Sequence, residues 1–108
     1  MRPEILSEGL GLAMAFGPDW LRPIQARLGA SYPELGGSEL DEYDRLCREA
    51  MEFGHLQVRV WWHRAGSEPE AFRLWSEEVR ARFPWATDRN LKHLFGQGRY
   101  YAWQDGDL

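Results

Sequence analysis

The sequence predicts a single all-α domain, residues 1–108, in which about five helices pack as an irregular bundle around one long central helix. Apolar residues recur every three or four positions along most of the chain, which places them on one side of a helix. Glycine, proline and serine interrupt this pattern at intervals typical of helix ends. The 108 residues are 44% hydrophobic and 28% charged, which is the size and composition of one soluble globular domain.

The first helix is expected over residues 3–16. Pro3 suits a first helical turn, where its missing backbone N–H has no partner to lose. Apolar side chains follow at helical spacing, namely Ile5, Leu6, Leu10, Ala13 and Met14. Gly17 and Pro18 then stop the helix. The apolar run is far shorter than the roughly 20 residues that cross a bilayer and lacks a plausible signal-cleavage site, so we expect a core helix.

A second helix is expected over residues 19–28. Its apolar residues share one face: Trp20, Leu21, Ile24 and Leu28. Pro23 has to lie in the first turn, because a proline deeper in a helix removes a backbone hydrogen bond. Gly29 is the expected C-cap, and residues 30–38 are expected to form a loop.

The central helix is expected to run from Leu40 to about Arg64. Its inward positions keep three-four spacing over more than five turns: Tyr43, Cys47, Ala50, Met51, Gly54, Val58, Trp61 and Trp62. Residues 56–62 also alternate between apolar and polar, which is typical of a strand. We favour the continuous helix because no second strand with a hairpin turn appears elsewhere. The alternative is an α+β fold with one short strand near 56–62.

The fourth helix has the clearest start in the chain. Ser67 can cap it and Pro69 suits its first turn, so we expect a helix over residues 68–83. Pro84 ends this helix, because the residue before a proline avoids helical geometry.

The last helix is expected over residues 88–96, capped by Thr87 or Asp88. Gly96 and Gly98 should loosen it. Residues 99–103 would then form a final turn or a separate short helix.

Charge and cysteine content exclude several classes of protein. The net charge is −4, carried unevenly: residues 1–54 hold a net −5 and residues 55–108 a net +1. This acidity argues against general binding to nucleic acid or to anionic membranes, so no partner of either kind is expected. The lone cysteine, Cys47, has no intrachain disulfide partner, and a reducing cytoplasm is the expected location.

No motif for catalysis or for a metal stands out. Glu52 and His55 have the Glu-x-x-His spacing that di-iron bundles use twice. The second copy is missing, because neither His63 nor His93 has a glutamate three residues earlier. Cys47 lies on the apolar side of the central helix and is read as a buried structural residue. We therefore assign no catalytic residue, metal or cofactor, and the sequence favours a non-enzymatic protein.

The strongest functional signal is the aromatic, basic C-terminal stretch. Between Arg73 and Arg99, six basic and three acidic residues interleave with aromatic ones, a composition suited to stacking on nucleic-acid bases or to binding an acidic peptide. Helical spacing explains Phe83 and residues 91–95 as core. It does not explain the aromatics near helix-breaking residues, which often form interfaces. The candidate binding residues are Trp85, Arg89, Lys92, Arg99, Tyr100, Tyr101 and Trp103, with Trp61 as a further candidate.

The sequence supports three functions, in descending order. The first is a protein-interaction domain that uses this surface to bind a protein partner or a second copy of the chain, as a homodimer. The second is a small ligand-binding domain or enzyme that holds an anionic molecule near Arg99 and His93 in an aromatic pocket. The third is a DNA-binding helix-turn-helix made by the helices at 68–83 and 88–96, which the overall acidity disfavours.

Overall fold

The computed structural model describes residues 1–15 and 17–108, and this part of the chain folds into five α-helices without a strand. The helices are α1 (Pro3–Ala13), α2 (Gln25–Ser31), α3 (Gly37–Arg64), α4 (Glu68–Arg82) and α5 (Asp88–Gln104), with one 3-10 turn, η1 (Gly17–Asp19), after α1. The predicted all-α fold with a long central helix is confirmed. The strand alternative is wrong, because residues 56–62 lie inside α3. None of these helices is long and apolar enough to cross a membrane.

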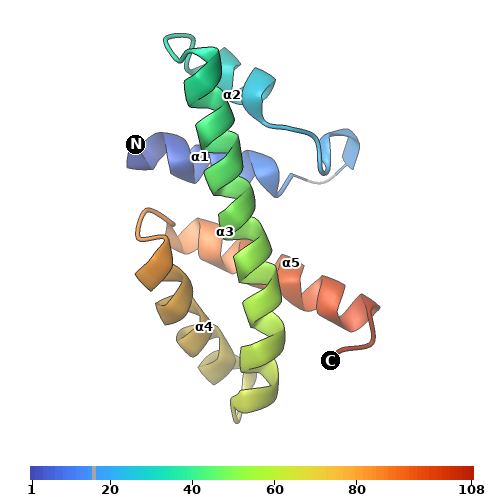
Figure 1. Cartoon of the computed structure of the whole chain (residues 1–108). Helices are drawn as coiled ribbons and strands as arrows, with labels where there is room; N and C mark the ends of the chain where they lie inside the picture. The colour runs from blue at the N-terminus through green and yellow to red at the C-terminus, as the bar shows by residue number, and fades with distance from the viewer. Residues whose placement is uncertain (16) are drawn as a thin grey trace.

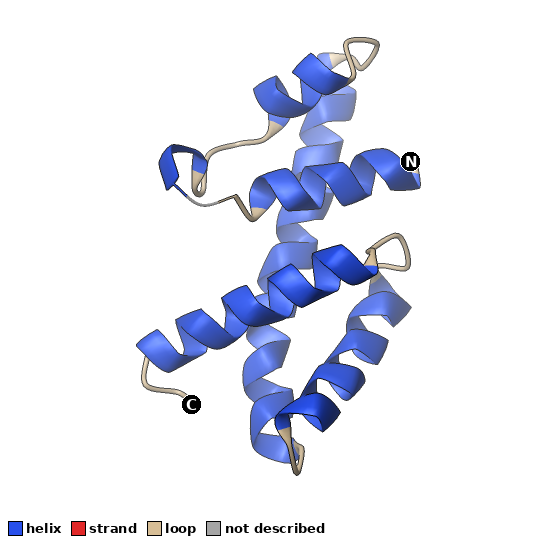
Figure 2. Cartoon of the chain, turned by 180° about the vertical axis from the view of Figure 1, so that it is seen from behind, coloured by secondary structure: helices blue, strands red, loops and turns tan. Residues whose placement is uncertain are grey.

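The central helix α3 is the axis of the molecule, and each of the other helices packs against it (Figure 1). α1 and α5 cross the same side of α3, as the view from behind in Figure 2 shows. α2 lies beside the first turns of α3 and α4 beside its last turns. The 28 residues of α3 span about 42 Å at 1.5 Å per residue, which sets the longest dimension of the molecule, 46 Å.

The core follows the covered side of α3 along its length. Its fully buried side chains include Ile5, Leu10, Leu28, Cys47, Val58, Trp75, Val79, Leu91 and Leu94. The thiol of Cys47 donates to the carbonyl oxygen of Leu6 at 3.4 Å. Burial, reinforced by the nearby Asp44 carboxylate, raises the pKa of this thiol to about 12. The prediction of a buried structural cysteine is confirmed, since a thiol with this pKa is not a nucleophile at neutral pH.

Two glycines allow α5 to cross α3 at short range. A Cβ atom on Gly98 would lie 2.8 Å from Val58 Cγ2 and 3.2 Å from His55 Cα. A Cβ atom on Gly54 would lie 2.8 Å from Leu94 Cγ. Both positions are therefore occupied by the one residue that fits the crossing. The predicted helix end at residue 96 is wrong, because α5 continues to Gln104 with Gly98 buried inside it.

The segment between α1 and α3 differs from the prediction. α1 ends at Ala13, and residue 16, the predicted end, lies outside the described residues. No α-helix covers 19–24, because Leu21 has a φ angle of +64°, a left-handed conformation incompatible with a right-handed helix. Pro23 therefore precedes α2 instead of lying in its first turn. Gly29, the predicted C-cap, lies within α2.

The two C-terminal helices begin where the sequence predicts. Ser67 caps α4, its hydroxyl accepting the Glu70 backbone N–H at 3.3 Å. Thr87 caps α5 by accepting the Asn90 N–H at 3.1 Å, and Asn90 Oδ1 accepts the Thr87 N–H in return at 3.1 Å. These caps satisfy N–H groups that a helix start leaves unpaired.

Candidate functional site

The helix α5 carries six of the seven predicted binding residues and has two unlike sides. Its inner side faces α3 and is buried: Leu91, Leu94, Gly98 and Ala102. Its outer side is made of the residues that helical spacing places opposite: Lys92, Gly96, Arg99, Tyr100 and Trp103. Four of these five are predicted binding residues, so the helix itself brings them onto one side.

Two large aromatic side chains stand exposed at the end of α5. Tyr100 is 49% and Trp103 is 65% exposed, and their ring centroids lie 6.3 Å apart. Trp62, from the last turns of α3, is half-buried beside them. These side chains line a pocket of about 390 Å³, which we call the aromatic surface, made by Trp62, Gly96, Arg99, Tyr100, Trp103 and Leu108.

The segment after α5 completes this pocket by returning to α3. The guanidinium of Arg59 pairs with the carboxylates of Asp105 at 2.7 Å and Asp107 at 2.9 Å. The imidazole of His63 donates to the Asp107 carbonyl oxygen at 2.6 Å. These contacts hold Leu108 in the wall of the aromatic surface.

Tyr101 points away from the aromatic surface. It touches Tyr100 edge to face at 5.4 Å, but its ring stacks on Trp20 at 5.7 Å and lies 5.6 Å from His55. Burial raises the pKa of the Tyr101 hydroxyl. The structure therefore places Tyr101 in the packing between α5 and the segment after α1.

The remaining predicted residues lie at the other end of α5 or on α3. Trp85, in the turn before α5, is half-buried and packs edge to face on Phe83 at 5.9 Å. Arg89 is exposed in the first turn and forms no ion pair with a described residue. It lies about 21 Å along the helix from Trp103, at 1.5 Å per residue. Trp61 faces α4, where its indole N–H donates to Glu78 at 3.2 Å.

A groove between α4 and α5 was not predicted from the sequence. It consists of two adjoining pockets of about 470 and 340 Å³, which share Phe72 and Lys92. The second pocket meets the aromatic surface at Gly96 and Arg99. The three pockets therefore form one groove that follows α5 from its first turn to Trp103.

The floor of the groove is apolar and well supported. It is formed by Phe72, Leu91 and Phe95, with the rings of Phe72 and Phe95 edge to face at 5.2 Å. Trp75 lies beneath them, fully buried, and its indole N–H donates to the Gly54 carbonyl oxygen at 2.9 Å. Such packing holds the floor in one arrangement before any partner arrives.

The rim of the groove is charged. Arg80 pairs with Asp88 and Arg99 pairs with Glu68, so both ion pairs join α4 to α5. A third pair, Arg73 with Glu77 at 3.2 Å, lies within α4. Lys92 also lines the groove, and it has no ion pair in the described part of the chain.

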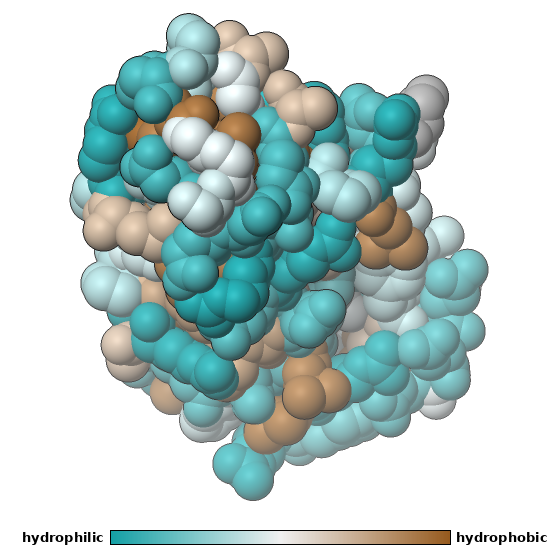
Figure 3. Space-filling view, turned by 45° about the horizontal axis from the view of Figure 1, so that its top comes forward, coloured by the Kyte–Doolittle hydropathy of each residue, from teal (hydrophilic) through white to brown (hydrophobic). Residues whose placement is uncertain are grey.

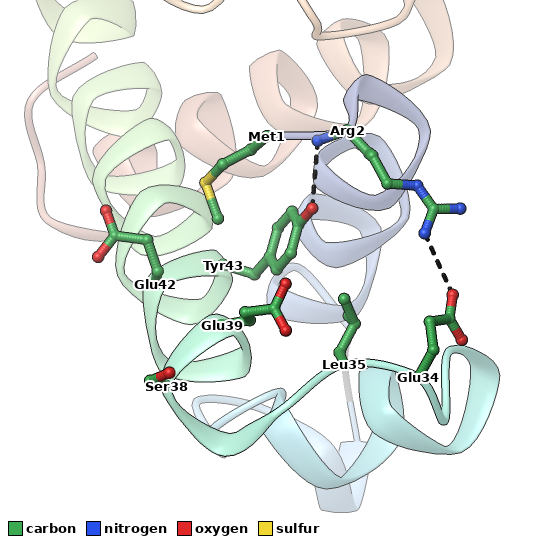
Figure 4. A pocket seen from close by; sticks show the side chains of 8 residues that line it. All are labelled: Met1, Arg2, Glu34, Leu35, Ser38, Glu39, Glu42 and Tyr43. Atoms are coloured by element: carbon green, nitrogen blue, oxygen red, sulfur yellow. Dashed lines mark hydrogen bonds and ion pairs between the residues drawn. The ribbon is translucent and has the colours of Figure 1, made fainter.

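A separate pocket, of about 620 Å³, lies at the opposite end of the molecule (Figure 4). Its lining residues are Met1, Arg2, Glu34, Leu35, Ser38, Glu39, Glu42 and Tyr43. The carboxylates are already engaged: Glu34 by Arg2 at 3.1 Å, Glu39 by the Gly36 N–H at 3.0 Å and Glu42 by Arg45. This pocket is the junction of the two N-terminal residues, the loop before α3 and the first turns of α3.

The side of α3 opposite α1 and α5 differs from the groove in the character of its side chains. α1 and α5 both lie on the other side of this helix (Figures 1 and 2). In the space-filling view of Figure 3, the visible face is largely hydrophilic, with hydrophobic side chains in small, separate patches. Scattered patches of this kind are ordinary on a protein surface.

His55 is engaged in the packing between α3 and α5. His55 Nε2 lies 2.9 Å from Gln97 Oε1, and Gln97 Nε2 donates to the Met14 carbonyl oxygen at 2.8 Å. The amide oxygen therefore faces the ring, and we assign the proton to His55 Nε2. Burial lowers the pKa of this imidazole. Within the described chain, no three His, Cys, Asp or Glu side chains are grouped to hold a metal.

In the alternative of a DNA-binding helix-turn-helix, α5 would be the recognition helix, and one residue in its first turn is committed to the fold. Asn90, which lies at the start of α5, is buried. Its side-chain amide donates to the Ser7 carbonyl oxygen at 3.2 Å, and the Ser7 hydroxyl donates to Asn90 Oδ1 at 2.9 Å. These bonds tie the first turn of α5 to α1, so Asn90 is not free to reach a base.

Comparisons with known proteins supply no assignment. No protein-family model matches the chain, and no match was found among the curated proteins or the solved structures. A functional proposal for this chain therefore rests on the geometry and chemistry of its own surface.

Proposed function

We propose that this chain is a non-enzymatic protein-interaction domain and that the aromatic surface binds its partner. The observation that carries the proposal is the exposure of Tyr100 and Trp103, at 49% and 65%, side by side on α5. Tryptophan and tyrosine are enriched among the few residues that dominate binding energy at protein interfaces. An adjacent exposed pair is therefore better explained by a protein partner than by the requirements of the fold.

The ligand-binding alternative has less support. A small-molecule site needs several polar groups that converge on the ligand. The lining of the aromatic surface holds a single charged side chain, Arg99, which is not a converging set of polar groups. His93, the second expected contact for an anion, does not line this pocket.

The test replaces the two exposed aromatics one at a time. We expect Trp103→Ala and Tyr100→Ala each to weaken association at least tenfold, the size typical of a dominant interface residue. Helicity should stay unchanged, because truncating an exposed side chain removes few core contacts. The matched control is Leu56→Ala, which removes a 62% exposed apolar side chain from α3.

The measurement has two parts. Sedimentation velocity reports self-association, and quantitative pull-down compares the proteins that each variant retains. Partners kept by the wild type and by Leu56→Ala but lost by both aromatic variants support the proposal. If Trp103→Ala and Tyr100→Ala sediment and retain partners as the wild type does, the aromatic surface is not an interaction site.

A further inference from the structure

We propose that the partner contributes an acidic amphipathic helix, which lies in the groove between α4 and α5 and ends on the aromatic surface. This inference rests on the proposed interaction function and specifies the chemistry of the bound segment. Four features of the groove carry it: its length, its apolar floor, the open position at Gly96 and the charge of its rim.

The length and setting of the groove suit a helix. From Asp88 to Trp103 the groove follows α5 for about 22 Å, at 1.5 Å per residue, which is the length of a helix of about 15 residues. α4 and α5 separate after the turn that joins them, and α3 lies behind both (Figure 2). An amphipathic helix can place its apolar stripe in such a channel between two helices.

The floor provides the apolar contacts that such a helix needs. Phe72 and Leu91 line the first part of the groove and Phe95 the second, and Tyr100 and Trp103 extend the apolar path at its end. A helix presents apolar side chains about every 5.4 Å along one side, so it can contact all parts of this path in turn.

Gly96 keeps the groove open where the pocket lined by Phe95 meets the aromatic surface. A Cβ atom added at this position would have no heavy atom of the folded chain within 4 Å. A larger side chain here would therefore project from α5 into the groove. The glycine weakens α5 by about 1 kcal/mol relative to alanine, and no contact within the domain requires it.

The rim selects an acidic partner. Four basic side chains, Arg73, Arg80, Lys92 and Arg99, line the groove against three acidic ones. Lys92 is available to a partner carboxylate. The Arg99–Glu68 pair is about half exposed, and exposed pairs contribute only about 0–1 kcal/mol, so a partner carboxylate can replace Glu68 at little loss. The side chains that line the groove carry a net charge of +1 on a chain of net charge −4, and this local excess favours an acidic segment.

The test is a selection from displayed random 16-residue peptides on the whole chain. We expect the enriched peptides to carry apolar residues at three-four spacing and a net negative charge. Lys92→Glu should weaken their binding at least tenfold in fluorescence anisotropy. The matched control, Arg45→Glu, makes the same change from a basic to an acidic side chain at an exposed position of α3 outside the groove and should alter binding less than twofold.

A second variant tests the groove without changing charge. Gly96→Leu should abolish peptide binding while the chain stays folded, because the added side chain meets open space. Amide chemical shifts in NMR spectra should change along α4 and α5 when a selected peptide is added.

Several outcomes overturn the acidic-helix proposal. They are no enrichment, enrichment of neutral or basic peptides, equal effects of Lys92→Glu and Arg45→Glu, and full binding by Gly96→Leu. Dimerisation that Gly96→Leu abolishes would instead identify a second copy as the occupant. If Trp103→Ala loses natural partners while Lys92→Glu and Gly96→Leu keep them, the interaction domain stands and the acidic helix does not.

Discussion

The two sides of α5 differ in how strongly the fold constrains them. On the inner side, Gly98 lies so close to α3 that even one added methyl group would overlap Val58. On the outer side, two residues earlier, Gly96 has open space where a side chain would be. Glycine therefore permits close packing at position 98, and at position 96 it leaves the groove unfilled.

This difference separates structure from function within one helix. The inner residues are what the crossing with α3 demands, and their identities follow from close packing. The outer residues include two exposed aromatics and a glycine that the helix does not need. Side chains that the fold leaves unexplained are the best candidates for contacts with another molecule.

The largest expected effect comes from breaking the inner side at its tightest contact. Leu94→Ala should lower the free energy of unfolding by about 2–5 kcal/mol, the range for deleting a buried leucine side chain. Gly54→Ala should lower it by about 1–3 kcal/mol, because the new methyl group overlaps Leu94. The double variant should lose less than the two losses combined, since Leu94→Ala makes room for the methyl group.

Urea denaturation followed by tryptophan fluorescence measures all three free energies. Strictly additive losses would show that Gly54 and Leu94 do not limit one another. The close crossing of α3 and α5 would then have another cause.

A smaller effect, opposite in sign on the two sides, is expected from adding one methyl group to each glycine of α5. Gly98→Ala should lower the free energy of unfolding by about 1–2 kcal/mol, because overlap with Val58 outweighs the gain in helix propensity. Gly96→Ala should raise it by about 0.5–1 kcal/mol, because only the propensity gain remains. Thermal unfolding followed by circular dichroism distinguishes the two, and shifts of the same sign would remove the contrast.

The packing between α3 and α5 should also respond to pH, through His55 on α3. Burial lowers the pKa of this imidazole, and Arg59 acts in the same direction, while the hydrogen bond that His55 donates to Gln97 and the charge of Glu52 oppose them. The unfolded chain, with an ordinary value near 6.5, then binds its proton at higher pH than the folded chain. The contribution of His55 to the free energy of unfolding is therefore fully present above about pH 6.5 and is lost as the pH falls through the lowered pKa of the folded state.

Urea midpoints between pH 7.5 and 5 test this expectation. His55→Gln should flatten the pH dependence, because the glutamine amide does not titrate. Equal slopes in the wild type and in His55→Gln would place the titrating group elsewhere.

The sequence was sufficient to predict the number of helices, the central helix and the starts at Ser67 and Thr87. These features depend on local periodicity and on capping hydrogen bonds, which neighbouring residues decide. It was not sufficient at residues 19–24, because the left-handed turn at Leu21 is held by the surrounding structure and by no local glycine.

The candidate site was predicted only in part for a similar reason. In the sequence, Gly96 and Gly98 indicate the end of a helix. In the structure the helix continues past both residues, because its close crossing with α3 stabilises it. Once α5 is continuous, its spacing places Tyr100 and Trp103 outward and turns Tyr101 toward Trp20. The groove depends on how α4 and α5 separate, and no local pattern encodes the angle between two helices.

The unequal exposure of the tryptophans gives the protein a built-in optical reporter. Trp75 is fully enclosed, so a soluble quencher such as acrylamide has no path to its indole, whereas Trp103 lies open to collision. Fluorescence from one chain thus has a quenchable and a protected component. A molecule that covers the aromatic surface would shift emission from the first component to the second, which allows occupancy to be followed without a label.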